Sequence, residues 1–165
     1  MNLGNKANIV LPILLVSIGV DQFTKYFAFN TLRGSELQSY FYDSLRIVYS
    51  ENIGAFLGMG NMLPAETRFW LFTVLVGLFL LTLLVYLFTA KKISPVELAA
   101  LSLVFSGGVS NFYDRATHSG AVIDFLNLGI GSVRTGIFNV ADMAIMLGAA
   151  MILVVSFKRN DRREM

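Results

Sequence analysis

Four long apolar segments limit the folds that this chain can adopt. They span residues 9–29, 69–88, 95–112 and 137–157. A helix needs about 20 mostly apolar residues to cross the hydrocarbon core of a bilayer. The second and fourth segments reach this length outright, and the third approaches it when it begins at Pro95, a residue suited to the first turn of a helix. Because 55% of the 165 residues are hydrophobic, we predict an all-α membrane protein with four transmembrane helices in a single domain.

Polar residues interrupt the first segment at Asp21, Gln22, Thr24 and Lys25. This helix must therefore bury a polar patch against its neighbours. Lys6 and the apolar run after it are also typical of a signal peptide, but Asp21 and Gln22 stand where a small-residue cleavage site would be expected. We therefore predict that the first helix is retained.

Lysine and arginine predict the orientation in the membrane. With four spans, Lys6, the Lys91-Lys92 turn and the basic tail from Lys158 to Arg163 fall on one side, which should be cytoplasmic. Both termini are then cytoplasmic, and the longer loops at residues 30–68 and 113–136 face outward. Residues 45–50 in the first of these loops are rich in β-branched and aromatic side chains, which predicts a short strand or hairpin.

The composition excludes several kinds of chemistry. The chain has no cysteine, so disulfides, thiol catalysis and thiolate metal sites are excluded. Its single histidine, His118, argues against catalytic zinc, which usually takes two or three histidines, and we interpret it as a loop residue. The net charge of +2 is mild, so we interpret the basic residues as signals of topology rather than as a nucleic-acid surface.

Two aspartates are the candidate catalytic residues. Asp142 lies inside the fourth segment, about 8 Å below its start at 1.5 Å per residue. A carboxylate at such a position is costly and indicates a functional site. Asp124 alone could be a solvated loop acid, but Val122-Ile123 and Phe125-Leu126 around it favour a place at the membrane interface. Two carboxylates that converge in a partly dry site can share one proton, so that one activates water and the other protonates a scissile carbonyl, without a metal or cofactor.

Further polar and small residues accompany this pair. Asn139 lies about one helical turn before Asp142, and Asn111 and Arg115 share a helix face, where they serve either packing or substrate binding. Asp21 and Lys25, four residues apart, are predicted to form an internal ion pair. The turn at Asn52 to Ala55 is equally compatible with a structural role and a substrate contact, and Gly107 permits close approach of two helices.

Five short motifs occur in order along the chain. They are Asp21-Gln22-Phe23-Thr24-Lys25, Asn52-Ile53-Gly54-Ala55-Phe56, the run from Gly107 to Arg115, Val122-Ile123-Asp124-Phe125, and Phe138-Asn139-Val140-Ala141-Asp142. Over nearly its whole length the chain thereby resembles the bacterial lipoprotein signal peptidases, or signal peptidase II. The resemblance implies an inner-membrane aspartic endopeptidase with four transmembrane helices, a small β-sheet on the outer (periplasmic) face, and an active site near that face.

The resemblance also implies a set of partners and site residues. The substrate would be a prolipoprotein, cleaved just before a cysteine that carries diacylglycerol. The protein would contact membrane lipids, act as a monomer without a cofactor, bind no nucleic acid, and be sensitive to cyclic peptides such as globomycin. Asp124 and Asp142 would be catalytic, and Asp21 and Lys25 would support the site. The residues that shape the site or bind substrate would be Asn52, Gly54, Ala55, Gly107, Asn111, Arg115, Asn139 and Ala141.

The chain departs from the family pattern at three places. Ser106 and Ser110 stand where glycine is common, and Gly54-Ala55-Phe56 is shorter than the usual Gly-Ala-Ala-Phe. These departures leave the two aspartates in place and bear on helix packing and on substrate or inhibitor preference.

Two other classes of function compete with a peptidase. Intramembrane carboxylates also mark proton relays, so a small proton-coupled transporter or channel subunit is one alternative. It would show flux without cleavage. A non-catalytic membrane scaffold is the other, and it would tolerate neutral replacements of Asp124 and Asp142.

Overall fold

Long apolar helices dominate the computed structural model, which describes residues 1–55 and 58–164, with side chains up to Lys158. The helices are α1 (Leu3–Leu32), α2 (Ala65–Arg68), the π-helical η2 (Phe69–Leu75), α3 (Val76–Thr89), α4 (Pro95–Thr117) and α5 (Val140–Glu164). Since α2, η2 and α3 are continuous, the described residues form four helices long and apolar enough to cross a membrane. The predicted number of membrane-length helices is confirmed.

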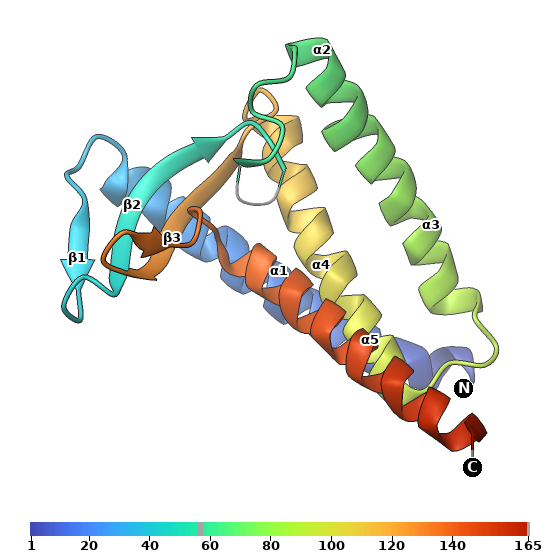
Figure 1. Ribbon diagram of the computed structural model, residues 1–165. Coiled ribbons are helices and arrows are strands. Elements are labelled where there is room, and N and C mark those ends of the chain that lie inside the picture. Colours follow the sequence, from blue (N-terminus) through green and yellow to red (C-terminus); the bar gives the residue numbers. More distant parts are fainter. Residues whose placement is uncertain (56–57, 165) are drawn as a thin grey trace.

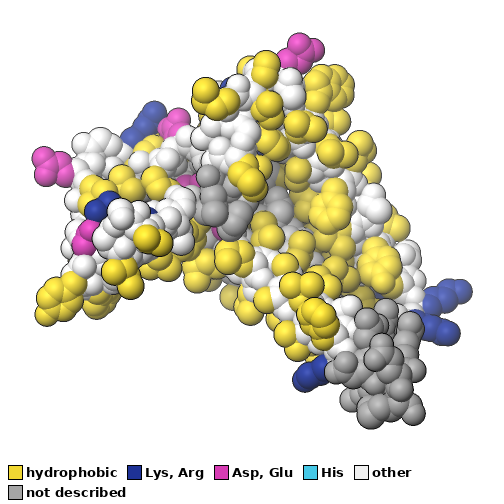
Figure 2. Space-filling view, in the orientation of Figure 1, with side chains coloured by type: hydrophobic (Ala, Val, Ile, Leu, Met, Phe, Trp, Pro, Cys, Tyr) yellow, Lys and Arg dark blue, Asp and Glu magenta, His cyan; other side chains and the backbone are white. Residues whose placement is uncertain are grey.

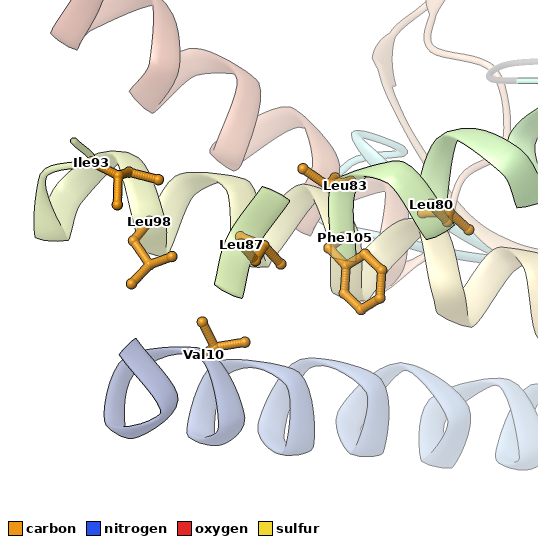
Figure 3. Close-up of a cluster of buried hydrophobic side chains, with 7 residues drawn as sticks. All are labelled: Val10, Leu80, Leu83, Leu87, Ile93, Leu98 and Phe105. Atoms are coloured by element: carbon orange, nitrogen blue, oxygen red, sulfur yellow. The ribbon is translucent and has the colours of Figure 1, made fainter. Parts of the chain in front are cut away.

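Helix α4 is the centre of the bundle and packs against α1, α3 and α5. Figure 3 shows the apolar cluster that joins three of these helices. Leu80, Leu83 and Leu87 project from α3 toward Leu98 and Phe105 of α4, and Val10 closes the cluster from α1. On the outer surface, hydrophobic side chains cover the helices, while lysine and arginine appear at the end opposite the sheet and, beside aspartate and glutamate, on the sheet, as Figure 2 shows. This pattern suits a bundle surrounded by lipid.

Lys6 ties α1 to α3 at the end of the bundle that holds both termini (Figure 1). Its ammonium is almost fully buried and donates to the carbonyl oxygens of Phe88 at 3.0 Å and Ala90 at 2.6 Å. The last carbonyls of a helix lack partners within the helix, so a cation stabilises them. At the same end, Ser94 is the N-cap of α4 and forms a reciprocal capping box with Glu97. The helix begins at Pro95, as predicted.

A small antiparallel sheet lies at the opposite end. Within the described residues its strands are β1 (Gln38–Tyr40), β2 (Leu45–Asn52), β3 (Val122–Ile130) and β4 (Val133–Arg134), in the order β1-β2-β3-β4. The predicted strand in residues 45–50 is β2. Its partner β3 pairs Asp124 with Ser50, and a register shift between Ile47 and Ser50 bends the pair. The segment around Asp124, which could have been a loop, is therefore a strand.

The predicted start of the fourth helix is wrong. Helix α5 begins at Val140 rather than at residue 137, because Phe138 is extended and pairs with β3. The Phe138 amide donates to the Leu126 carbonyl at 2.8 Å, and the Phe138 carbonyl accepts from Leu126 at 2.9 Å. Asp142 therefore lies in the first turn of α5 rather than about 8 Å along it. Helix α4 also continues to Thr117, so that Asn111 and Arg115 are helical, whereas Phe56 lies outside the described residues.

Glycine allows α5 to lie directly against α4. A Cβ atom on Gly148 would come within 2.5 Å of the Ala100 carbonyl oxygen and 2.8 Å of Val104 Cγ2. We expect Gly148→Ala to lower the free energy of unfolding by about 1–3 kcal/mol, because the extra methyl forces two packed helices apart. Thermal unfolding in detergent measures this loss.

The matched control is Gly19→Ala in α1, where a Cβ atom would meet nothing within 4 Å. Both changes raise helix propensity equally, by up to about 1 kcal/mol, so only the contact with α4 differs. Equal midpoints for the two variants would contradict the close packing of α4 on α5.

Candidate active site

A cavity of about 310 Å³ opens among η2, α3, α4, α5 and the ends of β2 and β3. Asp124 and Asp142 both line it, so the structure brings the two predicted carboxylates to one site. Asn52, Ala55, Asn111 and Arg115, which the family resemblance implies as site residues, also line it. The remaining lining residues are mostly apolar: Phe72, Val76, Gly108, Val122, Ile145, Met146 and Ala149. Apolar lining residues could not be told from core residues in the sequence.

Asp142 is fixed by the start of α5. Its backbone amide donates to Asn139 Oδ1 at 2.9 Å, and its own Oδ2 accepts from the Asn139 backbone amide at 3.2 Å. This reciprocal pair is a capping box, which satisfies amides at the beginning of a helix. Asn111 Nδ2 holds the other carboxylate oxygen at 3.0 Å. The side chain is thus held on both oxygens at the cavity wall.

Asp124 faces the cavity because of strand alternation. Ile123 and Phe125 on either side pack with Ala28 and Leu32 of α1, so Asp124 points to the opposite face of β3. Asn52 Nδ2 donates to Oδ2 at 3.0 Å and Asn139 Nδ2 donates to Oδ1 at 2.6 Å. Burial, and next the charge of Asp142, raise the pKa of this carboxyl from 3.8 to about 7.

Asn139 is the link between the two aspartates. Its amide nitrogen binds Asp124, and its side-chain oxygen and backbone amide bind Asp142. The residue is fully buried behind the cavity wall. Asn139 thus contacts the Asp124 carboxylate with its side-chain amide and the Asp142 carboxylate with its backbone amide, which fixes their relative position.

A buried ion cluster centred on Lys25 supports this arrangement. Lys25 Nζ lies 2.8 Å from Asp21 Oδ2 and 2.9 Å from Asp114 Oδ2, so the predicted Asp21–Lys25 ion pair is present. The ammonium also donates to Asn111 Oδ1 at 2.8 Å, and Asn111 in turn binds Asp142. Each of the three charged side chains is 1% exposed or less. Asn111 therefore connects Lys25 to Asp142 at the cavity.

The same cluster holds the backbone immediately before each candidate catalytic residue. Asp21 Oδ1 accepts from the Ala141 amide at 2.7 Å, and Asp114 Oδ2 accepts from the Ile123 amide at 3.1 Å. Ala141 precedes Asp142 and Ile123 precedes Asp124. The carboxylates of α1 and α4 thereby fix α5 and β3 at the two points where the cavity carboxylates emerge.

Sequence reasoning missed three members of this cluster. Ser110 Oγ donates to Asp21 Oδ2 at 2.7 Å, and Gln22 Nε2 donates to Ser110 Oγ and Asp114 Oδ1, each at 2.9 Å. Asp114 lies within the run from Gly107 to Arg115 but was not among the predicted site residues. The available signal was spacing, because Ser110 and Asp114 are four apart and share a helix face. Ser110, a departure from the usual glycine, is therefore used as a hydrogen-bond donor.

Arg115 forms part of the cavity rim. Its Nη2 donates to the Gly54 carbonyl at 2.6 Å, and its guanidinium lies 5.9 Å from the centre of the Phe72 ring. Phe72 belongs to the π-helical η2, a type of helix that often occurs at functional sites. Arg115 Nε is buried and has no hydrogen-bond partner among the described residues. Arg115 is therefore a candidate contact for a group that enters the site.

Other predicted site residues act from behind the cavity wall. Gly107 is where α5 approaches α4, because a Cβ atom there would collide with the Ala141 carbonyl and lie 2.7 Å from Ile145 Cγ1. The Gly54 carbonyl accepts from Arg115, and the Gly54 amide donates to Asn52 Oδ1 at 3.0 Å.

His118 lies near Phe29 and Thr117. Among the described residues, no group of three or more His, Asp or Glu side chains is placed to hold a metal ion.

Comparison with known proteins identifies the family. A family model described as Signal peptidase (SPase) II matches residues 13–158. The chain is 34% identical over 145 residues to a lipoprotein signal peptidase of Brevibacillus brevis, covering 88% of this chain and 92% of the relative. This chain belongs to the signal peptidase II family. It is also 33% identical over 153 residues to a lipoprotein signal peptidase of Hydrogenovibrio crunogenus, covering 92% of this chain and 87% of the relative.

A solved structure supports the same assignment. The fold matches a bacterial membrane enzyme determined by the in meso method, with a TM-score of 0.79, 27% sequence identity, and coverage of 93% of this chain and 90% of the other. The family resemblance expected from the sequence, the membrane-spanning helices and the small sheet are confirmed. The chain is accordingly a multi-pass membrane peptidase of the signal peptidase II family.

The Lys25 cluster predicts a strong effect on stability. We expect Lys25→Met to lower the free energy of unfolding by about 3–5 kcal/mol, because it leaves Asp21 and Asp114 buried without a cation. Combining it with Asp21→Asn and Asp114→Asn should recover much of that loss, since the amide oxygens can still accept from the backbone. Denaturant or thermal unfolding in detergent measures both steps.

The control is Arg33→Met, which removes an exposed pair with Glu51 at 3.6 Å and should cost about 1 kcal/mol or less. The cluster would not have the role described if Lys25→Met were as mild as Arg33→Met, or if the triple variant were less stable than Lys25→Met.

The raised pKa of Asp124 predicts a pH-dependent stability. The folded protein binds this proton more tightly than the unfolded chain, since the pKa is about 7 against 3.8. Stability from this group therefore falls as pH rises from about 4 to about 7 and is level above that. We expect the unfolding midpoint of Asp124→Asn to rise relative to wild type across this window. Exposed Glu36→Gln is the control, and parallel curves for Asp124→Asn and wild type would refute the raised pKa.

Proposed function

We propose that this chain is an aspartic endopeptidase, a single integral membrane peptidase domain that removes the signal peptide from prolipoproteins. The scissile bond lies just before a cysteine that carries diacylglycerol. The observation that carries this proposal is that Asp124 and Asp142 line one cavity and are joined through Asn139. The curated relatives are lipoprotein signal peptidases, which supports the same substrate class.

In the proposed reaction the two carboxylates share a proton near neutral pH. The raised pKa of Asp124, about 7, supports a singly protonated pair at that pH. The ionised carboxylate takes a proton from a water molecule that attacks the scissile carbonyl, and the protonated carboxyl donates to the carbonyl oxygen. The proton taken from the water then passes to the nitrogen of the leaving amine as the peptide bond breaks. Each step uses groups that the cavity already holds.

The surroundings of the cavity suit a substrate that arrives through lipid. Phe72 and Val76 form one side and Ile145, Met146 and Ala149 the other. In Figure 1, α3 and α5 diverge toward the sheet with α4 between them, and residues of all three helices line the cavity. A signal helix can therefore enter from the bilayer while its lipidated cysteine stays at the membrane surface. We propose that Arg115, whose Nε has no hydrogen-bond partner among the described residues, holds a peptide carbonyl, and that Asn52 and Asn111 complete the polar part of the wall next to Ala55.

The orientation follows from the charged end of the bundle. Lys91 and Lys92 lie in the turn between α3 and α4, at the same end as both termini (Figure 1). We assign this end to the cytoplasm and the sheet and cavity to the outer face of a bacterial inner membrane. The protein is expected to act as a monomer, and a cyclic peptide such as globomycin would occupy the cavity in place of substrate.

Cleavage of a purified diacylated prolipoprotein, followed by gel shift, tests the proposal. Asp124→Asn and Asp142→Asn should each reduce turnover on the order of 10³-fold or more, because either change removes the shared proton chemistry. Both proteins should stay folded, since Asn has nearly the same shape and removes a buried charge. Glu36→Gln, which alters an exposed carboxylate outside the cavity, should cleave normally.

Retained turnover in either Asp variant would refute the paired-aspartate mechanism. Inhibition by a chelator would instead point to a metal. Proton or solute flux without cleavage would favour a transporter, and unchanged biological function in both variants would favour a scaffold.

A further inference from the structure

A second hollow lies on the face of β3 opposite the cavity. This groove, of about 480 Å³, runs between the end of α1 and the sheet. Its lining is almost entirely apolar or aromatic and includes Phe23, Phe27, Ala28, Tyr40, Phe125 and Leu126. Since Asp124 points the other way, the groove is separate from the candidate active site.

The groove continues the lipid-facing surface of α1. Phe23 and Phe27 line it and are 70% and 59% exposed, on a helix long and apolar enough to span a bilayer. Both residues lie in the C-terminal third of that helix, next to the sheet. The groove therefore opens onto the acyl chains that surround α1, rather than onto a separate patch of surface.

The hairpin beside the groove presents aromatic side chains outward. Phe41 is 74% exposed and Tyr42 is fully exposed. Phe41, Tyr42 and Asp43 have φ values of 52°, 54° and 67°, a region that bulky residues rarely adopt. The Asp43 carboxylate holds the turn by accepting from Arg46 Nε at 2.7 Å and Nη2 at 2.6 Å. Aromatic residues displayed at the end of a span suit a bilayer interface.

We propose that the groove is a binding site for one acyl chain of a membrane phospholipid, and that the β1–β2 hairpin rests on the bilayer beside it. The groove is continuous with the lipid-facing surface of α1, which supports a lipid rather than a second copy of the chain as its occupant. The bound chain fills the space behind Phe125 and Leu126. It thereby supports the strand that holds Asp124 from the side away from the cavity.

Fluorescence of a single tryptophan tests this site without using peptidase activity. Trp70 is the only tryptophan of the sequence, so Trp70→Phe gives a silent background. Tyr40→Trp in that background places the probe in the groove, and Gln38→Trp is a second groove probe. Ser39→Trp is the matched control, since it lies between them on β1 and faces the other side of the sheet. Each protein is reconstituted in phosphatidylcholine vesicles with or without bromine on the acyl chains.

We expect brominated acyl chains to remove most of the emission of Tyr40→Trp and Gln38→Trp and little of that of Ser39→Trp. Adding Thr24→Phe, which fills the groove from α1, should restore the emission of Tyr40→Trp. Equal quenching of groove and control probes would overturn the site, and so would quenching that Thr24→Phe leaves unchanged. A blue-shifted emission that bromine does not quench would show that protein, such as a second copy, covers the groove.

Discussion

The buried ammonium of Lys25 holds together the elements that form the candidate site. It is shared by carboxylates from α1 and α4, and those carboxylates also hold the backbone amides of Ala141 and Ile123. A charge in this position is costly unless it is fully paired, and here every member has a partner. Because the two held amides directly precede Asp142 and Asp124, the cluster sets where both cavity carboxylates emerge.

The carboxylates of the two aspartates are held by hydrogen bonds, but no cation in the part of the chain that the structure describes contacts them directly. Asn139, Asn52 and Asn111 bind the carboxylates through neutral amides, while Lys25 acts one residue away. Neutral donors fix geometry without removing the electrostatic conflict between two close carboxylates. Burial, and next the charge of Asp142, therefore raise the pKa of Asp124 in spite of these donors. The charge that stabilises the fold is thus kept separate from the charges proposed to do the chemistry.

The helix bundle and the sheet contribute in different ways. Glycines at 107 and 148 let α5 lie against α4, which brings the start of α5 to the cavity. The sheet supplies Asp124 from one face of β3 and packs Ile123 and Phe125 on α1 with the other. One strand therefore connects the proposed catalytic cavity with the proposed lipid groove. We therefore expect a change in packing between β3 and α1 to shift the position of Asp124.

The four membrane-length helices, the Asp21–Lys25 pair and the candidate aspartates could be predicted from the sequence alone, because apolar length and the cost of intramembrane charge are local properties. Strand β3, the start of α5 at Val140, and the roles of Ser110, Asp114 and Asn139 were decided only by the tertiary structure. Each depends on contacts between segments far apart in the chain, such as Phe138 with Leu126 or Lys25 with Asp114. Helical and strand periodicity place a side chain on a face, but only packing decides which partner it meets there.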